Sequence, residues 1–223
     1  LRSRSTMDGL RWLARTPAFA PMEYSKLGLE QFTPDYTAYF HGLPEPVRDA
    51  LLPAQWQLYK GIDTETIGAI HDELYRRTVG GGWPGAVLTP GVEVTSACIV
   101  DDAIHLGVRH VQQGTTAEVR TSAVVAATGY AETPTGPLLA GLGDAVRRDA
   151  RGRLVVGPDY RLELDVPGSI FVQNAERHTH GPGAPDLGLG AWRAAAILNT
   201  VCGKAVYELP ERTAFTTFGL EDR

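Results

Sequence analysis

A run of three glycines, Gly80 to Gly82, separates two hydrophobic patterns in this chain of 223 residues. Before the glycines, apolar residues recur every three or four positions, which predicts amphipathic helices. After them, apolar and polar residues alternate from Ala86 onward, which predicts β-strands. The expected fold class is therefore α/β, with a block of helices followed by a block of strands.

The helical block is expected to begin at Thr33, whose side chain can cap a helix that has Pro34 in its first turn. This helix should end near Gly42, and two shorter helices should follow before Tyr59. The strongest prediction is a helix from Asp63 to Arg77. Its apolar stripe, at positions i, i+3 and i+7, consists of Ile67, Ile70 and Leu74.

A short strand is expected near the start of the chain, and a series of strands should follow the glycines. The ranges are 11–15, 86–88, 92–100, 104–111 and 117–120. Tight turns at Asp101-Asp102 and Gln113-Gly114 join the later members into a meander. Ala123 to Ala127 is apolar throughout, so we expect a strand buried on both faces. A meander that feeds a buried strand indicates a β-ribbon inserted into an α/β sheet.

A second buried strand is predicted at Ser169–Asn174, followed by a glycine- and proline-rich bend, His180–Gly190, and a helix at Ala191–Val201. Such a bend exposes backbone N–H groups to a flat or anionic ligand, such as a phosphate or a flavin carbonyl. An ordinary loop is the alternative. The expected inner face of the helix consists of Ala195, Leu198 and Cys202, with Gly203 as its C-cap.

Arg15 directly follows the first predicted strand. Nucleotide phosphates commonly bind at the carboxyl ends of strands in α/β domains, although a solvated surface arginine is the alternative. Ala127-Thr-Gly-Tyr130 ends the predicted buried strand, where Gly129 permits a tight backbone approach. Taken alone, such a tetrapeptide is more commonly a simple strand exit.

Charge and composition exclude several classes of protein. The net charge of −5 does not favour nucleic-acid or membrane binding, and two cysteines, Cys98 and Cys202, are too few for a disulfide scaffold. No apolar run is long enough to span a bilayer, and residues 1–15 lack the apolar stretch of a signal peptide. His178-Thr-His180 has no third metal ligand spaced nearby. A cytoplasmic protein without a metal site is expected.

Several longer motifs occur together, and they extend over almost the whole chain. They are Arg15-Thr-Pro-Ala-Phe19, Met22-Glu-Tyr-Ser-Lys-Leu-Gly-Leu-Glu30, Phe32-Thr-Pro-Asp-Tyr36, Ala127-Thr-Gly-Tyr130, Gln173-Asn-Ala-Glu-Arg-His-Thr-His-Gly181, Asp186-Leu-Gly-Leu-Gly-Ala-Trp-Arg193 and Glu211-Arg-Thr-Ala-Phe-Thr-Thr-Phe-Gly219. In this combination the chain resembles the bacterial flavin-dependent N-hydroxylating monooxygenases of siderophore biosynthesis, particularly the lysine and diamine enzymes.

The resemblance implies that NADPH reduces FAD and that O₂ then adds to the flavin as a hydroperoxide. The terminal amine of the substrate attacks the distal oxygen and becomes a hydroxylamine. The flavin performs the chemistry, so no catalytic side chain is expected. A dry site would favour the reactive unprotonated amine, because burial disfavours the ammonium form.

The resemblance also implies roles for individual residues, which are those of the matching positions in the family. Arg15 matches the arginine that contacts the 2′-phosphate of NADPH. The bend from Gly181 through Asp186 to Gly188 matches the segment beside the isoalloxazine and the amine, with Leu187 and Gly188 nearest. Asn174 leads into this bend on the flavin side. Lys26 and Lys60 stand near positions where ornithine-specific members carry asparagines, and are expected to contact substrate.

The missing asparagines favour L-lysine or a diamine such as cadaverine over L-ornithine. The family binds FAD and NADPH through Gly-x-Gly-x-x-Gly turns, and the glycine run that begins at Gly80 is no substitute because it joins a helix to strands. The chain therefore resembles the C-terminal part of a two-dinucleotide-domain flavoprotein. A homo-oligomer is expected, and a non-catalytic interaction module is the alternative. The expected parts are an NADPH-binding domain at 1–22 and 86–133, a helical amine-substrate insert at 23–85, and the end of the FAD-binding domain at 134–223.

Overall fold

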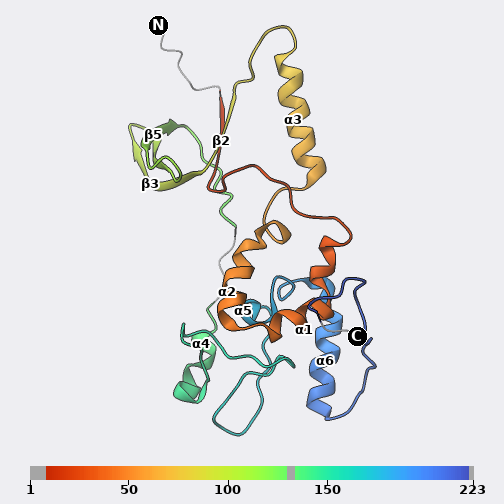
Figure 1. Cartoon of the computed structure of the whole chain (residues 1–223). Helices are drawn as coiled ribbons and strands as arrows, with labels where there is room; N and C mark the ends of the chain where they lie inside the picture. Colours follow the sequence, from red (N-terminus) through yellow and green to blue (C-terminus); the bar gives the residue numbers. More distant parts are fainter. Residues whose placement is uncertain (1–8, 130–133, 221–223) are drawn as a thin grey trace. The chain divides into compact units, whose positions relative to one another are not determined.

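The computed structural model describes residues 9–129 and 134–220 (Figure 1). These residues form two compact units, each made of two chain segments. Unit 1 contains residues 9–22 and 61–129, and unit 2 contains residues 23–60 and 134–220. The segment 23–85, expected as one helical insert, is therefore divided between the two units after Lys60.

Unit 1 contains a two-stranded parallel sheet. Strand β1 (Leu10–Ala14) pairs with β2 (Ala86–Pro90) from Leu10↔Ala86 to Ala14↔Pro90. Helix α3 (Thr64–Thr78) belongs to the same unit, and Asp63 caps it by accepting a hydrogen bond from the N–H of Thr66 at 2.9 Å. The predicted strands near residues 11–15 and 86–88, the predicted helix near 63–77 and its start at Asp63 are confirmed. The expected apolar stripe of α3 is only half-buried, because no residue of this helix is covered completely.

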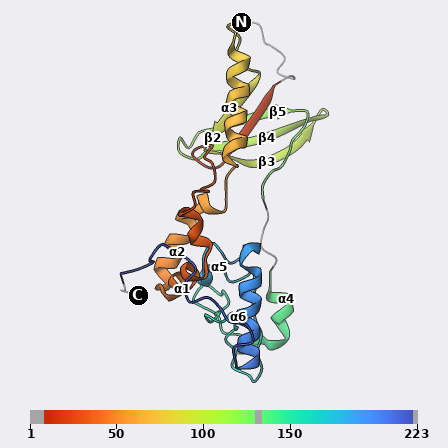
Figure 2. The same cartoon turned by 90° about the vertical axis from the view of Figure 1, so that its right-hand side faces the viewer.

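The predicted meander is confirmed. Strands β3 (Val92–Val100), β4 (Ala103–His110) and β5 (Thr116–Thr121) form an antiparallel sheet in that order (Figure 2). Asp101 and Asp102 both have positive φ, which suits the two-residue turn between β3 and β4. The inner face of this sheet is buried at Val92, Leu106 and Val108, with Leu13 and Val119 packed against it.

The predicted buried strand at Ala123–Ala127 is wrong. This segment is irregular and exposed, and the side chain of Val125 is 93% exposed. An apolar strand buried on both faces needs a sheet neighbour, and none of the described residues pairs with this segment. Gly129, in the tetrapeptide that follows, has positive φ, and Tyr130 lies outside the described residues.

Unit 2 is built mainly from short helices joined by irregular segments. Its longer helices are α1 (Pro34–Gly42), α2 (Glu45–Ala54) and α6 (Gly190–Cys202), and its shorter ones are α4 (Gly136–Leu139), α5 (Arg177–His180), η1 (Gly28–Phe32), η2 (Trp56–Leu58), η3 (Ala140–Ala145) and η4 (Leu187–Leu189). Thr33 caps α1 through the N–H of Tyr36 at 3.3 Å, as predicted. Gly203 ends α6 in the left-handed conformation, which is also as predicted.

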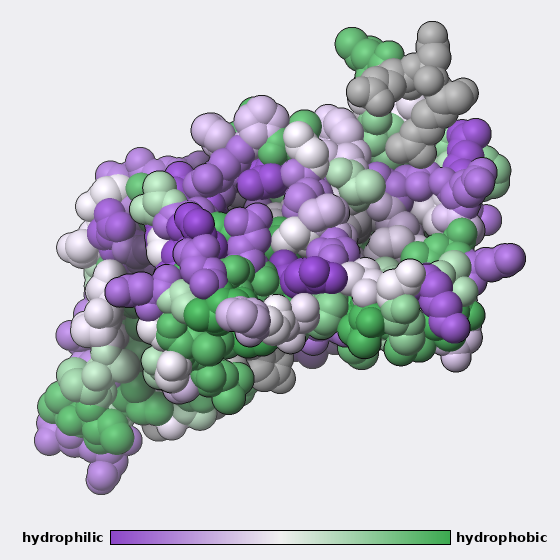
Figure 3. Space-filling model, turned by 90° about the horizontal axis from the view of Figure 1, so that it is seen from below, coloured by the Kyte–Doolittle hydropathy of each residue, from purple (hydrophilic) through white to green (hydrophobic). Residues whose placement is uncertain are grey.

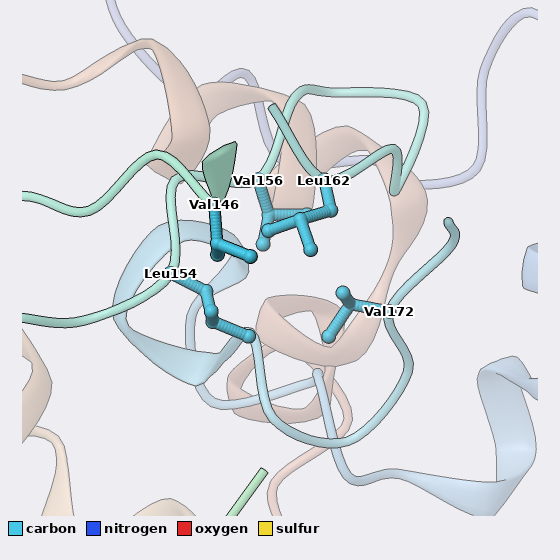
Figure 4. Close-up of a cluster of buried hydrophobic side chains, with 5 residues drawn as sticks. All are labelled: Val146, Leu154, Val156, Leu162 and Val172. Atoms are coloured by element: carbon cyan, nitrogen blue, oxygen red, sulfur yellow. The ribbon is translucent and has the colours of Figure 1, made fainter. Parts of the chain in front are cut away.

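The core of unit 2 comes from an irregular stretch rather than from regular strands. Five buried side chains point toward one another (Figure 4): Val146, Leu154, Val156, Leu162 and Val172. The predicted strand at Ser169–Asn174 is wrong, because only an isolated bridge between Phe171 and Arg161 forms there. Tyr160 and Asn174 both have positive φ, which turns the backbone and keeps the extended segments on either side short.

Side-chain carboxylates join distant parts of unit 2. Glu30 accepts hydrogen bonds from the backbone N–H groups of Phe215 (3.0 Å) and Thr216 (2.8 Å), and Asp35 accepts from that of Ala214 (3.2 Å). These bonds hold the C-terminal segment against η1 and α1. Arg153 plays a similar role beside α2. It forms ion pairs with Asp49 (2.6 Å), Glu45 (3.1 Å) and Asp149 (2.6 Å).

Large apolar side chains also remain at the surface, and Figure 3 shows hydrophobic patches, in green, on the face that it draws. Those that are more than four-fifths exposed include Trp83, Val125, Leu138, Leu187 and Phe215. None of the helices in residues 9–129 and 134–220 is long and apolar enough to cross a membrane.

Candidate functional site

The bend between α5 and α6 begins at Gly181, against the ring of Phe40. A Cβ added to Gly181 would lie 3.0 Å from the Cγ of Phe40, and the backbone there has φ 80° and ψ −166°. A Cβ added to Gly183 would lie 3.7 Å from the Cα of Phe32, so the bend also packs on η1. Glycine is required at the start because other residues rarely adopt these angles.

The far end of the bend carries the two residues that were expected nearest to a flavin. The carboxylate of Asp186 accepts a hydrogen bond from the N–H of Gly188 at 3.1 Å and thereby starts η4. Leu187 is 88% exposed, whereas Leu189 is buried. The bend therefore presents one apolar side chain and one bare glycine to solvent from a backbone that is fixed on both sides.

Arg193, in the first turn of α6, is 2% exposed and reaches under this bend. Its Nη1 donates to the Oδ1 of Asn174 (2.9 Å) and to the carbonyl oxygen of Ala184, and its Nη2 donates to the carbonyl oxygen of Asp186 (2.9 Å). The predicted inner face of α6 is wrong in its second half. Ala195 is half-buried, whereas Leu198 is 38% exposed and Cys202 is exposed.

A group of buried ionisable side chains lies beside Arg193. Glu176 is completely buried, and its Oε1 is 3.6 Å from the Nη1 of Arg193. Burial raises the pKa of Glu176 to about 7, although the charge of Arg193 opposes this shift. The ring of His180 stacks on that of Tyr160 at 4.5 Å, and burial lowers the pKa of His180 to about 3. His180 is therefore a neutral core residue at physiological pH.

Asn174, predicted to lie on the flavin side, is exposed and has a φ of 70°. Its side-chain oxygen accepts a hydrogen bond from Arg193. The structure therefore brings Asn174, Asp186 and Arg193 together at the base of the bend. Asn174, which was predicted as a site residue, is thus linked to the predicted bend through Arg193, which was not.

The two predicted substrate lysines are both exposed. The Nζ of Lys60 lies 5.6 Å from the centre of the Tyr59 ring, and the Cζ of Arg177 lies 5.3 Å from the same centre. Tyr59 thus has two cationic neighbours. Lys26 stands just before η1, which packs under the bend.

Arg15 is exposed and directly follows β1, at the carboxyl end of the strand, where it was predicted to be. It belongs to unit 1, whereas the bend and the two lysines belong to unit 2. The expected contact of Arg15 with a nucleotide phosphate stays a prediction.

Sequence reasoning missed Glu176 and Arg193, although both lie inside motifs that it singled out. Their exclusion from water was the missing information, since charged residues are usually exposed. His178 and His180 lie on the helical turn α5, and the Nε2 of His178 is 2.7 Å from the carbonyl oxygen of Leu154. Among the residues that the structure describes, no group of three or more potential ligands could hold a metal ion.

Comparison with known proteins gives concordant results. A family model described as L-lysine 6-monooxygenase/L-ornithine 5-monooxygenase matches residues 1–132. The chain is 42% identical over 215 residues to the Rhizobactin siderophore biosynthesis protein RhbE of Rhizobium meliloti, covering 95% of this chain and 47% of that protein. It is 41% identical over 209 residues to the putrescine N-hydroxylase of Shewanella oneidensis, covering 94% of this chain and 41% of that protein.

Among solved structures, the chain is similar to DfoA, the FAD-bound cadaverine monooxygenase of desferrioxamine biosynthesis from Erwinia amylovora. The TM-score is 0.86 at 35% sequence identity, and the match covers 96% of this chain and 49% of that one. The chain therefore spans about half the length of the relatives that it matches.

Proposed function

Because the chain belongs to the L-lysine 6-monooxygenase/L-ornithine 5-monooxygenase family, we propose that it forms part of a flavin-dependent amine N-hydroxylase. The proposed reaction is NADPH- and O₂-dependent hydroxylation of a terminal amine, which would supply a hydroxamate siderophore. The observation that carries this proposal is the fixed bend at Gly181–Gly190, which offers Leu187 and Gly188 to a flat ligand.

The proposed substrate is a linear diamine such as putrescine or cadaverine. Two of the most similar proteins are a putrescine N-hydroxylase and a cadaverine monooxygenase, which supports this choice. L-lysine is the second candidate. Lys60 and Arg177 flank Tyr59, and two cations at one place would attract the carboxylate of lysine and repel the second ammonium group of a diamine.

The residues of the bend fit one wall of an FAD site. Leu187 supplies apolar surface, and Gly188 leaves the backbone bare, so the face of an isoalloxazine ring could approach closely. Reduced FAD, when bound, supplies the electrons that activate O₂. The pyrophosphate of FAD would need a Gly-x-Gly-x-x-Gly turn that leads from a strand into a helix. The match to this pattern in the sequence, Gly80–Gly85, instead follows helix α3 and precedes strand β2.

The part of the mechanism assigned to this chain is positioning and exclusion of water. An alkylamine with a pKa of about 10.4 is almost fully protonated at neutral pH, and only its neutral form is nucleophilic. Leu187 would lie beside the amine and reduce the solvation of its ammonium form, which favours loss of the proton. Asp186 holds the Gly188 N–H in a hydrogen bond to its carboxylate, so the bend would not need to reorganise when the ligands bind. Arg15 is proposed to hold the 2′-phosphate of NADPH.

The test is an amine panel with the purified full-length enzyme to which this chain is proposed to belong, combined with its visible absorption spectrum. We expect a flavin spectrum and hydroxylamine from putrescine or cadaverine with NADPH. L-lysine as the better substrate would shift the proposal to the second candidate. A flavin-loaded protein that oxidises NADPH but forms no hydroxylamine from any amine would contradict the proposed reaction.

A further inference from the structure

Arg193 is a buried cation in a place that does not favour one. It lies in the first turn of α6, where the positive end of the helix dipole repels a guanidinium, and it is 2% exposed. Removing a charged group from water has a large free-energy cost unless polar groups surround it. The contacts of Arg193 must therefore explain its presence, because helix formation does not.

Those contacts join the segment before α5 to the middle of the bend. Nη1 donates to the side chain of Asn174, which precedes α5, and to the carbonyl oxygen of Ala184 within the bend. Nη2 donates to the carbonyl oxygen of Asp186, one residue before Leu187. The planar guanidinium fixes these three acceptors in one geometry, which a lysine ammonium would not reproduce.

The direction of Leu187 depends on this geometry. Its side chain is 88% exposed, so packing within the described residues does little to orient it. Its backbone is instead held between the Asp186 carbonyl, bound by Arg193, and the Gly188 N–H, bound by the Asp186 carboxylate. A backbone held on both sides presents Leu187 and Gly188 in one arrangement.

Glu176 supplies the balancing charge in its ionised form, which is favoured above its folded-state pKa of about 7. It is completely buried, and its Oε1 lies 3.6 Å from the Nη1 of Arg193. At this distance the two groups attract without a direct hydrogen bond, which leaves both Nη atoms available to the bend. A buried guanidinium without such a carboxylate would be strongly destabilising.

We propose that Arg193 is a positioning residue for N-hydroxylation, which holds the Ala184–Gly188 backbone in place with Glu176 as its buried counter-charge. This inference rests on the proposed function and assigns a role to two residues outside the expected set of ligand contacts. Arg193 acts through the bend, so its loss should impair use of the activated oxygen more than reduction of the flavin by NADPH.

The experiment compares Arg193→Lys and Arg193→Met with the wild type in the flavin-loaded protein. Arg153→Lys is the matched control, since Arg153 is also a partly buried, multiply bonded arginine of unit 2 but lies outside the bend. Two quantities are measured: amide hydrogen exchange in residues 181–190, and hydroxylamine formed per NADPH oxidised. The exchange measurement does not depend on activity.

For both Arg193 variants we expect faster exchange of the bend and about tenfold less hydroxylamine per NADPH, since small displacements near reacting atoms are costly. The rate of NADPH oxidation and the KM for NADPH should stay close to wild type, and Arg153→Lys should change neither readout. A variant that merely lost stability would lower both rates together.

Unchanged exchange in the bend would overturn the proposal, and so would faster exchange with an unchanged yield of hydroxylamine. If the wild type forms no hydroxylamine from any amine, the proposed function fails. The exchange measurement then still decides whether Arg193 holds the bend.

Discussion

Gly181 and Phe40 are in contact with no room for a side chain between them. A Cβ on Gly181 would lie 3.0 Å from the Cγ of Phe40 and 3.3 Å from both Cδ atoms, and Phe40 is completely buried. The two residues belong to segments that are far apart in the chain, so this contact joins α1 to the start of the bend. It explains why the bend begins with glycine.

Replacing Gly181 by alanine should destabilise unit 2 for two reasons. The backbone angles of φ 80° and ψ −166° are nearly specific to glycine, and the new methyl group would collide with Phe40. We expect Gly181→Ala to lower the free energy of unfolding by about 3 kcal/mol. Urea denaturation measures this value. The control is Gly152→Ala, which also has positive φ but open space around its Cβ position, and should cost about 1 kcal/mol. Equal losses would contradict the steric argument.

Arg153 should contribute more to stability than an ordinary surface arginine. Its side chain is 26% exposed and pairs with Asp49, whose side chain is 10% exposed, as well as with Glu45 and Asp149. Arg153→Ala leaves Glu45 and Asp149 without this cation and Asp49 with only Arg151, at 3.0 Å, so we expect a loss of about 2 kcal/mol. The exposed pair of Arg147 and Asp165 provides the control, and Arg147→Ala should cost less than about 1 kcal/mol. Similar midpoints in thermal unfolding for both variants would refute this difference.

Acid should destabilise the protein partly through His180. Its pKa is lowered by burial, with smaller contributions from the charges of His41 and His178, to about 3 in the folded state, from an ordinary value of 6.5. Between these two values the unfolded chain binds the extra proton, so the free energy of unfolding falls as the pH falls below 6.5. Replacing His180 by Phe keeps an aromatic ring against Tyr160 and should remove this component. The slope of stability between pH 4.5 and 6.5, measured by urea titration, should then decrease. An unchanged slope would show that His180 does not titrate in this way.

Glu176 should produce a slope of the opposite sign. Burial raises its folded-state pKa to about 7 from an ordinary value of 4.5, so in this interval the folded protein binds the extra proton. Its contribution to the free energy of unfolding therefore falls as the pH rises from 4.5 to 7. Glu176→Gln cannot titrate and should lack this fall, whatever its absolute stability. The same urea titrations measure the effect, and identical pH profiles for wild type and Glu176→Gln would contradict it.

Arg15→Ala should affect the KM for NADPH and the KM for NADH differently if Arg15 contacts the 2′-phosphate. NADH lacks this phosphate, so the loss of a charge-assisted hydrogen bond should raise the KM for NADPH by about tenfold and leave that for NADH almost unchanged. Arg11, which is exposed on β1, serves as the control position through Arg11→Ala. Steady-state oxidation assays with both cofactors measure the effect. Equal increases for the two cofactors would remove Arg15 from the phosphate site.

The sequence by itself determined the elements whose signals are local. Thr33, Asp63 and Gly203 mark helix ends because each acts on backbone groups within a few residues. The β3–β4–β5 meander was predictable for the same reason, since alternation and turn residues specify neighbouring strands. The bend at 181–190 could be located from its glycines and prolines alone.

Only the tertiary structure decided which surfaces are covered. Ala123–Ala127 has the composition of a buried strand, but burial requires a neighbouring strand, and the described residues supply none. Leu198 has the spacing of a core residue, yet Arg193 on the same helix is the residue that is buried. The pairing of Arg193 with Glu176 joins positions on opposite sides of the bend. Their exclusion from water strengthens the attraction between them and makes the loss of either partner costly. Hydrophobic periodicity carries no information about such a pair, because it records where apolar side chains recur and not which charged groups the fold encloses.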